Sequence, residues 1–329
     1  MAHRVIKRRM RDIGFNTAGF GAATDLAGCL TWDIAQLATG QLDVERSLVQ
    51  FDEAWIGSVT VDRAALHQVR VAMGWGVVLL PAPESDAVYF EGRRLVAGDT
   101  VLLPPDSSIE LLTHAVGRVF LIAFRGCAGT RVRVRRPRWY TSAVGHASSG
   151  FPEDLRTLLA SVYSGEKHIA AALEARLLSW LRAALSDAER PDDQVTVLPR
   201  RRMAVERVRR FIHEHLAETM TLAELCSHAH LQARSLEYGF RDLVGLSPFK
   251  YIKMLRLGEV RRRLQASSAA ERSVSEVALD CGFCHLSQFA ADYKRVFLER
   301  PSATRRAIGC ARPARLARYE TEPVAFAAR

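Results

Sequence analysis

Nine polar side chains in two short stretches near the C-terminal end are spaced for the exposed faces of helices. The first stretch carries Arg234, Glu237, Tyr238 and Arg241, and the second carries His285, Ser287, Gln288, Lys294 and Arg295. Arginine suits the acceptor atoms of guanine, glutamine suits adenine, and lysine suits phosphate oxygens. These residues are therefore our candidates for contact with double-stranded DNA.

A second motif with chemical potential overlaps the later stretch. Cys281, Cys284 and His285 form C-x-x-C-H, the attachment pattern of c-type haem. Haem attachment requires export, and the sequence shows no signal-peptide pattern. A zinc site needs a second pair of ligands, for which Cys226 and Cys310 are poorly spaced. A redox-sensing thiol pair stays an alternative, but we interpret these residues as buried or turn cysteines and expect no metal and no cofactor.

The N-terminal half offers little that resembles a catalytic centre. His67 and His114 stand alone, without the H-x-H pair followed by Glu that a metal-dependent barrel enzyme would need. No G-x-S-x-G motif or phosphate-binding glycine loop stands out. Trp55 and Trp75 could line a ligand pocket, but we interpret them as core residues. We expect no enzymatic activity, and the sequence assigns no effector-binding residue.

The polar stretches near the C-terminal end belong to an internal repeat. Two capping boxes, Thr221–Glu224 and Ser273–Glu276, each begin a short helix and lie 52 residues apart. Apolar pairs and terminal prolines repeat at an offset of 53, namely Leu236 and Phe240 with Phe289 and Tyr293, and Pro248 with Pro301. A short helix, a tight turn and a longer helix form a helix-turn-helix unit. The repeat predicts two such units, at about 221–244 and 273–297.

The second helix of each unit must carry the DNA-contacting side chains, because this recognition helix enters the major groove. We expect recognition helices over about 233–244 and 286–297. Their expected inward faces are Leu236, Phe240 and Leu243 in the first and Phe289, Tyr293 and Phe297 in the second, with Ala291 and Asp292 outward. A basic helix over 248–267 connects the units, and phosphate contact is expected for some of its six Lys and Arg residues. It could hold the recognition helices one DNA turn apart, roughly 34 Å.

Residues 235–257 and 274–306 resemble the two-part DNA-binding domain of AraC/XylS-type bacterial transcription regulators. The resemblance covers about 100 residues and is carried by F-x(6)-SP-x(2)-Y-x(4)-RL after the first unit, and by the GF turn and F-x(3)-YK-x(2)-F in the second. It implies transcription control at a promoter in response to a small molecule sensed by the N-terminal domain. Leu298 stands where the family usually has Gly, and Ala291 replaces a long polar residue. Both departures weaken the expectation of base contact by the second unit.

Short β-rich segments follow one another between Ser47 and Arg138 at intervals of about 8–12 residues, which predicts an antiparallel barrel or sandwich. A turn is expected at Gly98-Asp99, whereas residues 1–45 show no clear pattern. This region resembles the cupin-like sensory barrels attached to such DNA-binding domains. Two helices are expected next, over 152–163 and 167–188. The apolar stripe from Ile169 to Leu185 in the second leaves two alternatives open, packing on the barrel or a homodimer interface.

The predicted fold is α+β with two domains. A β-rich, cupin-like barrel with flanking helices spans 1–190, a linker spans 191–203, an all-α tandem helix-turn-helix domain spans 204–307, and 308–329 form a flexible tail. From Arg200 onward there are 24 Lys and Arg against 14 Asp and Glu, a net charge of +10, while the preceding residues balance at 22 each. Excess positive charge confined to one domain favours a polyanion partner. Because no apolar run reaches 18 residues, we expect a cytoplasmic, nucleoid-associated protein without membrane contact.

These patterns predict a sequence-specific DNA-binding transcription regulator, with activation favoured over repression. Its expected partners are double-stranded DNA, a small-molecule effector and RNA polymerase. The alternative is a metal-dependent cupin-type enzyme that carries a nucleic-acid-binding tether. Turnover by residues 1–190 with bound metal would support that alternative.

Overall fold

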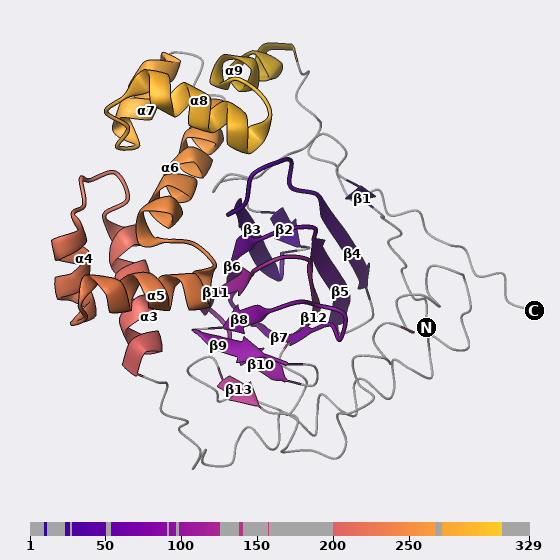
Figure 1. Ribbon diagram of the computed structural model, residues 1–329. Helices are drawn as coiled ribbons and strands as arrows, with labels where there is room; N and C mark the ends of the chain where they lie inside the picture. Colours follow the sequence, from indigo (N-terminus) through magenta and orange to yellow (C-terminus); the bar gives the residue numbers. More distant parts are fainter. Residues whose placement is uncertain are drawn as a thin grey trace, which may run out of the picture.

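The computed structural model describes residues 10–11, 24–26, 28–50, 54–90, 92–96, 99–125, 138–140, 157, 200–266 and 272–310. Figure 1 shows two β-sheets with a group of helices along one side. The sheets come from the part of the chain up to Tyr140, and helices α3 to α9 come from Arg200 onward. The predicted α+β class, with a β-rich first part and an all-helical second part, is confirmed.

Both sheets are antiparallel throughout. The first has the strand order β1-β4-β5-β12-β7-β10-β13, and the second has the order β2-β3-β6-β11-β8-β9. The strands are β1 (Met10–Arg11), β2 (Thr24–Leu26), β3 (Leu30–Gln36), β4 (Val44–Gln50), β5 (Ala54–Val61), β6 (Ala65–Val71), β7 (Trp75–Pro81), β8 (Val88–Phe90), β9 (Arg93–Leu95), β10 (Thr100–Leu103), β11 (Ser108–Thr113), β12 (Gly117–Arg125) and β13 (Arg138–Tyr140).

An apolar core joins the two sheets. Strands β5, β7 and β12 are buried at almost every residue, and Trp32, Leu79 and Leu121 belong to the core. Within the described residues, every hydrogen-bonded ladder joins strands of the same sheet, so the sheets do not close into one barrel. The expected cupin-like barrel is therefore seen as two sheets packed over a shared core.

The predicted strands between 47 and 124 are all present. Strands β1, β2 and β3 lie in the stretch without a clear pattern and were missed, although Leu30 to Ile34 of β3 alternate between apolar and polar residues. The expected turn at Gly98-Asp99 includes Gly98, which lies outside the described residues; the β8–β9 hairpin turns at Gly92 with φ +73°. Trp55 is a core residue as expected.

One long helix separates the helical part into two groups. Figure 1 shows α6 (Pro248–Gln265) running from α3, α4 and α5 at one end to α7, α8 and α9 at the other. The remaining helices are α3 (Arg200–Glu214), α4 (Leu222–Ala229), α5 (Ala233–Val244), α7 (Val274–Asp280), α8 (Leu286–Phe297) and α9 (Pro301–Cys310). Helix α3 begins inside the expected linker. In the described part of the chain, no helix has the length and apolarity needed to cross a membrane.

Several expectations concern residues outside those described. They are the helices over 152–163 and 167–188, with the apolar stripe from Ile169 to Leu185, most of the linker, and residues 311–329 of the tail.

Candidate nucleic-acid interface

Each helix-turn-helix unit begins with a capping box. Before α4, Thr221 Oγ1 accepts a hydrogen bond from Glu224 N at 3.2 Å, and Glu224 Oε2 accepts one from Thr221 N at 2.7 Å. Before α7, the matching distances between Ser273 and Glu276 are 3.1 and 2.6 Å. Each box satisfies two backbone amides that a helix start leaves unpaired. The internal repeat predicted from the sequence is thus confirmed at the start of both units.

The turns of the two units are stabilised differently. The first passes through His230 in the left-handed conformation, with φ 52°, and the second passes through Gly282, with φ 83°. A Cβ atom on Gly282 would lie 2.7 Å from the Ala217 carbonyl oxygen, so glycine is required. Arg256 of α6 donates to Leu216 O at 2.8 Å and to Gly282 O at 2.9 Å. The second turn is therefore held against the connecting helix.

The recognition helices α5 and α8 bury the predicted inward faces. Their inward residues are Leu236, Phe240, Leu243, Phe289, Tyr293 and Phe297, each at most 4% exposed. The Tyr293 hydroxyl reaches a partner, Thr304 Oγ1, at 2.9 Å, so its polar atom is satisfied in the core. This burial fixes which sides of α5 and α8 face outward.

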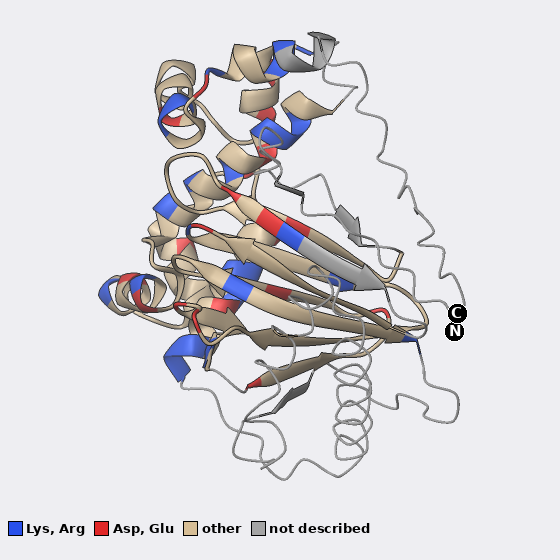
Figure 2. Ribbon diagram, turned by 90° about the vertical axis from the view of Figure 1, so that its right-hand side faces the viewer, with Lys and Arg blue, Asp and Glu red and all other residues tan. Residues whose placement is uncertain are grey.

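The candidate DNA-contacting residues lie on those outward sides. Arg234, Tyr238 and Arg241 on α5 are exposed, as are His285, Ser287, Gln288, Lys294 and Arg295 at or in α8, while Glu237 is half-buried. Glu237 pairs with Arg241 at 4.0 Å, and Arg201 lies 5.0 Å over the Tyr238 ring. The structure gathers one set on each recognition helix, and α6, 18 residues or about 27 Å long, separates the two sets. Basic residues are spread over the whole helical group (Figure 2).

Asp292 does not occupy its expected outward position, since only 2% of it is exposed. Lys253 of α6 donates to its carboxylate at 3.1 Å, and Arg295 pairs with its other oxygen. Burial would raise the pKa of Asp292, but hydrogen bonds from Lys253 and Gln288 and the charges of Lys253 and Arg295 hold it below its usual value. Asp292 lies three residues after Phe289 and therefore at the edge of the buried face of α8. This spacing in the sequence could have indicated its burial.

Most basic side chains of α6 are engaged within the protein. Arg261 is buried and pairs with Glu299 at 2.9 Å. Others have partners as well: Arg262 and Arg263 pair with Glu259, Lys253 pairs with Asp292, and Arg256 donates to backbone carbonyls. Of the six bases expected to offer phosphate contacts, Lys250 is exposed and is the clearest candidate.

The C-x-x-C-H motif forms the turn between α7 and α8. Cys281 is buried, and burial raises the pKa of its thiol to about 11, whereas Cys284 is exposed. The backbone amide of Cys281 donates to Val277 O at 3.2 Å and so closes α7. Among the described residues, no group of three or more His, Cys, Asp or Glu side chains is arranged to hold a metal ion.

His67 and His114 have structural partners. Trp32 Nε1 donates to His67 Nδ1 at 3.1 Å, and His67 Nε2 lies 3.3 Å from Thr113 Oγ1. Burial, together with the nearby charge of Arg46, lowers the pKa of His67 to about 3. His114 stacks on Tyr89 with 4.6 Å between the ring centroids. The neutral His67 side chain is thus part of the sheet core.

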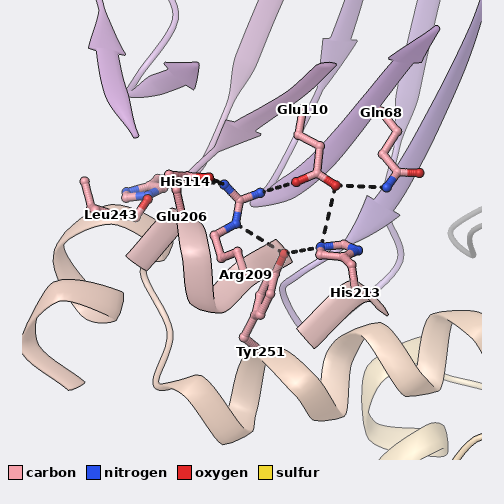
Figure 3. Close-up of polar contacts among 8 residues, drawn as sticks. All are labelled: Gln68, Glu110, His114, Glu206, Arg209, His213, Leu243 and Tyr251. Carbon is pink, nitrogen blue, oxygen red and sulfur yellow. Dashed lines mark hydrogen bonds and ion pairs between the residues drawn. The ribbon is translucent and has the colours of Figure 1, made fainter. Parts of the chain in front are cut away.

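A buried polar cluster that the sequence did not predict joins the sheets to the helices (Figure 3). Arg209 of α3 donates to Glu110 of β11 and to Glu206 at 2.8 Å each, and its Nε lies 3.4 Å from the Tyr251 hydroxyl. His213 lies 2.9 Å from the same hydroxyl and 3.6 Å from Glu110. Arg209 is therefore bonded to β11, α3 and α6 at once.

Charge and burial act against each other in this cluster. Burial would raise the pKa of Glu110, but the charges of His213 and Arg209 lower it below its usual value. Burial lowers the pKa of His213 in spite of the nearby Glu110 carboxylate, which favours the neutral imidazole. At neutral pH, where the lowered pKa leaves His213 uncharged, the ion pair between Glu110 and Arg209 is the charge contact between β11 and α3.

The sheets also contact the C-terminal ends of both recognition helices. His114 Nε2 donates to Leu243 O of α5 at 2.7 Å. Gly40 N and Gln36 Nε2 donate to Val296 O of α8 at 3.0 and 3.3 Å. Since the acceptors are backbone carbonyls, no side-chain motif could have revealed these contacts. The β-rich part therefore touches both helix-turn-helix units.

Comparison with known proteins agrees with the predicted domain. The profile of a helix-turn-helix domain family matches residues 225–307, which lie within α4 to α9. The XylDLEGF operon transcriptional activator of Pseudomonas putida is 34% identical over 141 residues, 43% of this chain and 41% of that protein. The transcriptional activator RhaS of Pectobacterium carotovorum is 28% identical over 104 residues, 32% of this chain and 36% of that protein. The chain thus spans less than half the length of either relative.

A solved structure is also similar to part of this chain. It is a probable AraC family transcriptional regulator from Rhodopseudomonas palustris, with 30% sequence identity and a TM-score of 0.31, and the match covers 32% of this chain and 96% of that one.

Proposed function

We propose that this chain, whose C-terminal helix-turn-helix domain is similar to that of AraC/XylS-type bacterial transcription regulators, binds specific DNA sequences and activates transcription at promoters. The observation that carries this proposal is the pair of capped helix-turn-helix units, each with an exposed polar face on its recognition helix. Two such faces on one connecting helix suit two successive major-groove contacts along a duplex.

The proposed base contacts come from both recognition helices. Arg234 and Gln288 lie in their first turns, which are the parts that approach base edges, and both side chains are exposed. Arginine would bond the acceptors of guanine, and glutamine would bond adenine. Glu237, Tyr238, Arg241, His285, Ser287, Lys294 and Arg295 complete the proposed interface, with Lys294 placed to contact phosphate.

The other proposed partners follow from the division of the chain into a β-rich part and a helical part. We propose that residues 1–190 sense a small molecule and pass the signal to the DNA-binding domain, 204–307, through the contacts that Glu110, His114 and Gln36 make. RNA polymerase would be the partner of an activator, self-association through residues 169–185 would give a homodimer, and the bacterial cytoplasm would be the site of action.

The proposal is tested with the full chain and a randomised pool of duplexes. The chain should enrich one family of duplexes, and the affinity for the most enriched duplex should exceed that for a scrambled duplex of the same composition. The double variant Arg234→Ala, Gln288→Ala should reduce this preference by about 30-fold or more, because two lost base contacts of about 1–3 kcal/mol each amount to at least about 2 kcal/mol.

Arg94→Ala is the matched control, because it removes an exposed arginine from strand β9 of the sheets. It should leave the preference unchanged. If the double variant keeps the wild-type preference at equal salt, the assignment of base-contacting residues is wrong. If the full chain enriches no duplex family, the proposed function itself is wrong.

A further inference from the structure

We propose that Asp292 determines the specificity of the second helix-turn-helix unit by withholding two basic side chains from the DNA phosphates and by orienting the Gln288 amide toward a base. This inference rests on the proposed function and concerns one residue of the same interface. Asp292 would act through its neighbours, so its role is that of a positioning residue.

The geometry around Asp292 is that of a hub. Its carboxylate is buried beside α6, yet the side chains that bind it come from the surface, because 42% of the Lys253 side chain and 62% of the Arg295 side chain are exposed. Lys253 bonds one carboxylate oxygen and Arg295 bonds the other. Arg295 of the proposed DNA interface and Lys253 of the adjoining helix α6 are thus already neutralised before any DNA arrives.

Neutralised cations contribute little to non-specific affinity. Each Lys or Arg that contacts a phosphate releases counterions and steepens the salt dependence of binding, whatever the sequence. Asp292 holds Lys253 and Arg295 in ion pairs, and an acid at a DNA interface also repels the phosphate backbone. Both effects lower binding to any duplex and so leave discrimination to the base contacts.

The same carboxylate orients Gln288. Gln288 lies one helical turn before Asp292, and its side chain hydrogen-bonds to Asp292. A glutamine amide has two donor hydrogens and one carbonyl oxygen. With one hydrogen bound to Asp292, the second hydrogen and the oxygen remain free, and these are the groups that a bidentate contact with adenine uses.

The first unit cannot contain an equivalent hub. The residue that corresponds to Asp292 at the repeat offset of 53 is Gly239, and it is buried against α3. A Cβ atom there would lie 2.9 Å from Val205 Cγ2 and 3.1 Å from Arg201 Cγ. The hub therefore belongs to the second unit alone, where Ala291 provides no long side chain of its own.

The test compares wild type with Asp292→Asn in the full chain, on the most enriched duplex and on its scrambled counterpart. The substitution keeps the shape of the side chain and removes its charge. We expect the affinity for the scrambled duplex to rise about 3- to 10-fold near 0.1 M salt, with a plot of log K against log salt concentration steeper by about 1 to 2. The preference for the enriched duplex should fall by about 10-fold.

Asp242→Asn is the matched control, since it removes one exposed negative charge from α5. It should alter the binding of both duplexes equally and keep the preference. If Asp292→Asn folds but weakens the binding of both duplexes in parallel, Asp292 has only a structural role and the inference is overturned. Unchanged binding and preference would overturn it as well.

Lys253→Gln gives a second, independent outcome that holds even if Asp292→Asn does not fold. Because Lys253 is bonded to Asp292 and not to phosphate, its removal should leave the salt slope unchanged. If the slope of log K against log salt concentration becomes shallower by about 1, Lys253 contacts a phosphate and the inference is overturned. If the wild-type chain selects no duplex from the pool, the proposed function itself is wrong.

Discussion

At the residue scale, Leu298 is a non-glycine residue in a backbone conformation that favours glycine. It caps the C-terminal end of α8 in the left-handed conformation, with φ 60°, and 66% of it is exposed. The first unit ends α5 with Gly245 at φ 74°, which carries no Cβ penalty. The departure from the family pattern at this position therefore concerns the helix end and its strain, because Leu298 lies beyond the outward face that would meet DNA.

Leu298→Gly should stabilise the full chain by about 1 kcal/mol, since a left-handed non-glycine residue costs about 1–2 kcal/mol and part of the gain is lost to the greater freedom of glycine in the unfolded chain. Urea unfolding followed by circular dichroism would measure the change. Leu298→Ala keeps the Cβ atom and serves as the control. An equal gain from alanine would show that exposure of the leucine, and not its backbone conformation, is the cause.

At the scale of elements, α6 acts as the part that aligns the second unit with the first. Arg256 connects it to the segment after α3 through Leu216 O and to the second turn through Gly282 O. Burial lowers the pKa of Arg256, which shows that its guanidinium is partly removed from water. Arg256 thus uses its donor hydrogens on backbone carbonyls of the protein, and few remain to bind a DNA phosphate.

Arg256→Gln should destabilise the chain by about 2 kcal/mol, because hydrogen bonds from a charged donor contribute about 1.5–3 kcal/mol. It should also leave the salt slope of non-specific DNA binding unchanged. Thermal unfolding and binding to a scrambled duplex at several salt concentrations measure the two effects. Lys250→Gln is the comparison, with a smaller slope and wild-type stability expected. A slope reduced equally by both variants would contradict this division of roles.

The elements also show what could be predicted from the sequence. The capping boxes, the inward faces of α5 and α8, and the strands from β4 to β12 follow local rules of spacing, and most were found. Strand β3 was missed although Leu30 to Ile34 alternate between apolar and polar residues, which is the pattern that marks a strand. Asp292 was misplaced because its partner Lys253 is 39 residues away, and helical spacing alone does not reveal a partner on another element.

At the scale of the whole molecule, the polar contacts of the sheets reach four helices of the helical domain. They reach α3 and α6 through Arg209, α5 through Leu243 O and α8 through Val296 O. A conformational change in the β-rich part could thus alter the positions of both recognition helices. None of these contacts could be predicted, because each joins groups far apart in the sequence and most end on backbone carbonyls.

The ion pair between Glu110 and Arg209 is the contact between the sheets and α3 whose removal should destabilise their packing most. The folded-state pKa of Glu110 lies below its usual value of 4.5, so the contact stabilises the protein above that pH and is lost as the pH falls through the lowered pKa. At neutral pH, Glu110→Gln removes the charge and keeps the shape. Arg209 would retain Glu206, so the loss should be about 1 kcal/mol.

Hydrogen exchange of the backbone amides tests this expectation. In Glu110→Gln, amides of α3 should exchange about 5-fold faster at neutral pH, because 1 kcal/mol corresponds to that factor when exchange follows local opening. Glu84→Gln is the matched control, because it breaks an ion pair at 2.8 Å between the loop after β7 and Arg118 of β12. If both variants accelerate exchange in α3 alike, the Glu110 contact does not hold the helices. If Glu110→Gln alone does so, the sheets restrain α3 through this one carboxylate, and a molecule bound by the β-rich part would have a physical route to the recognition helices.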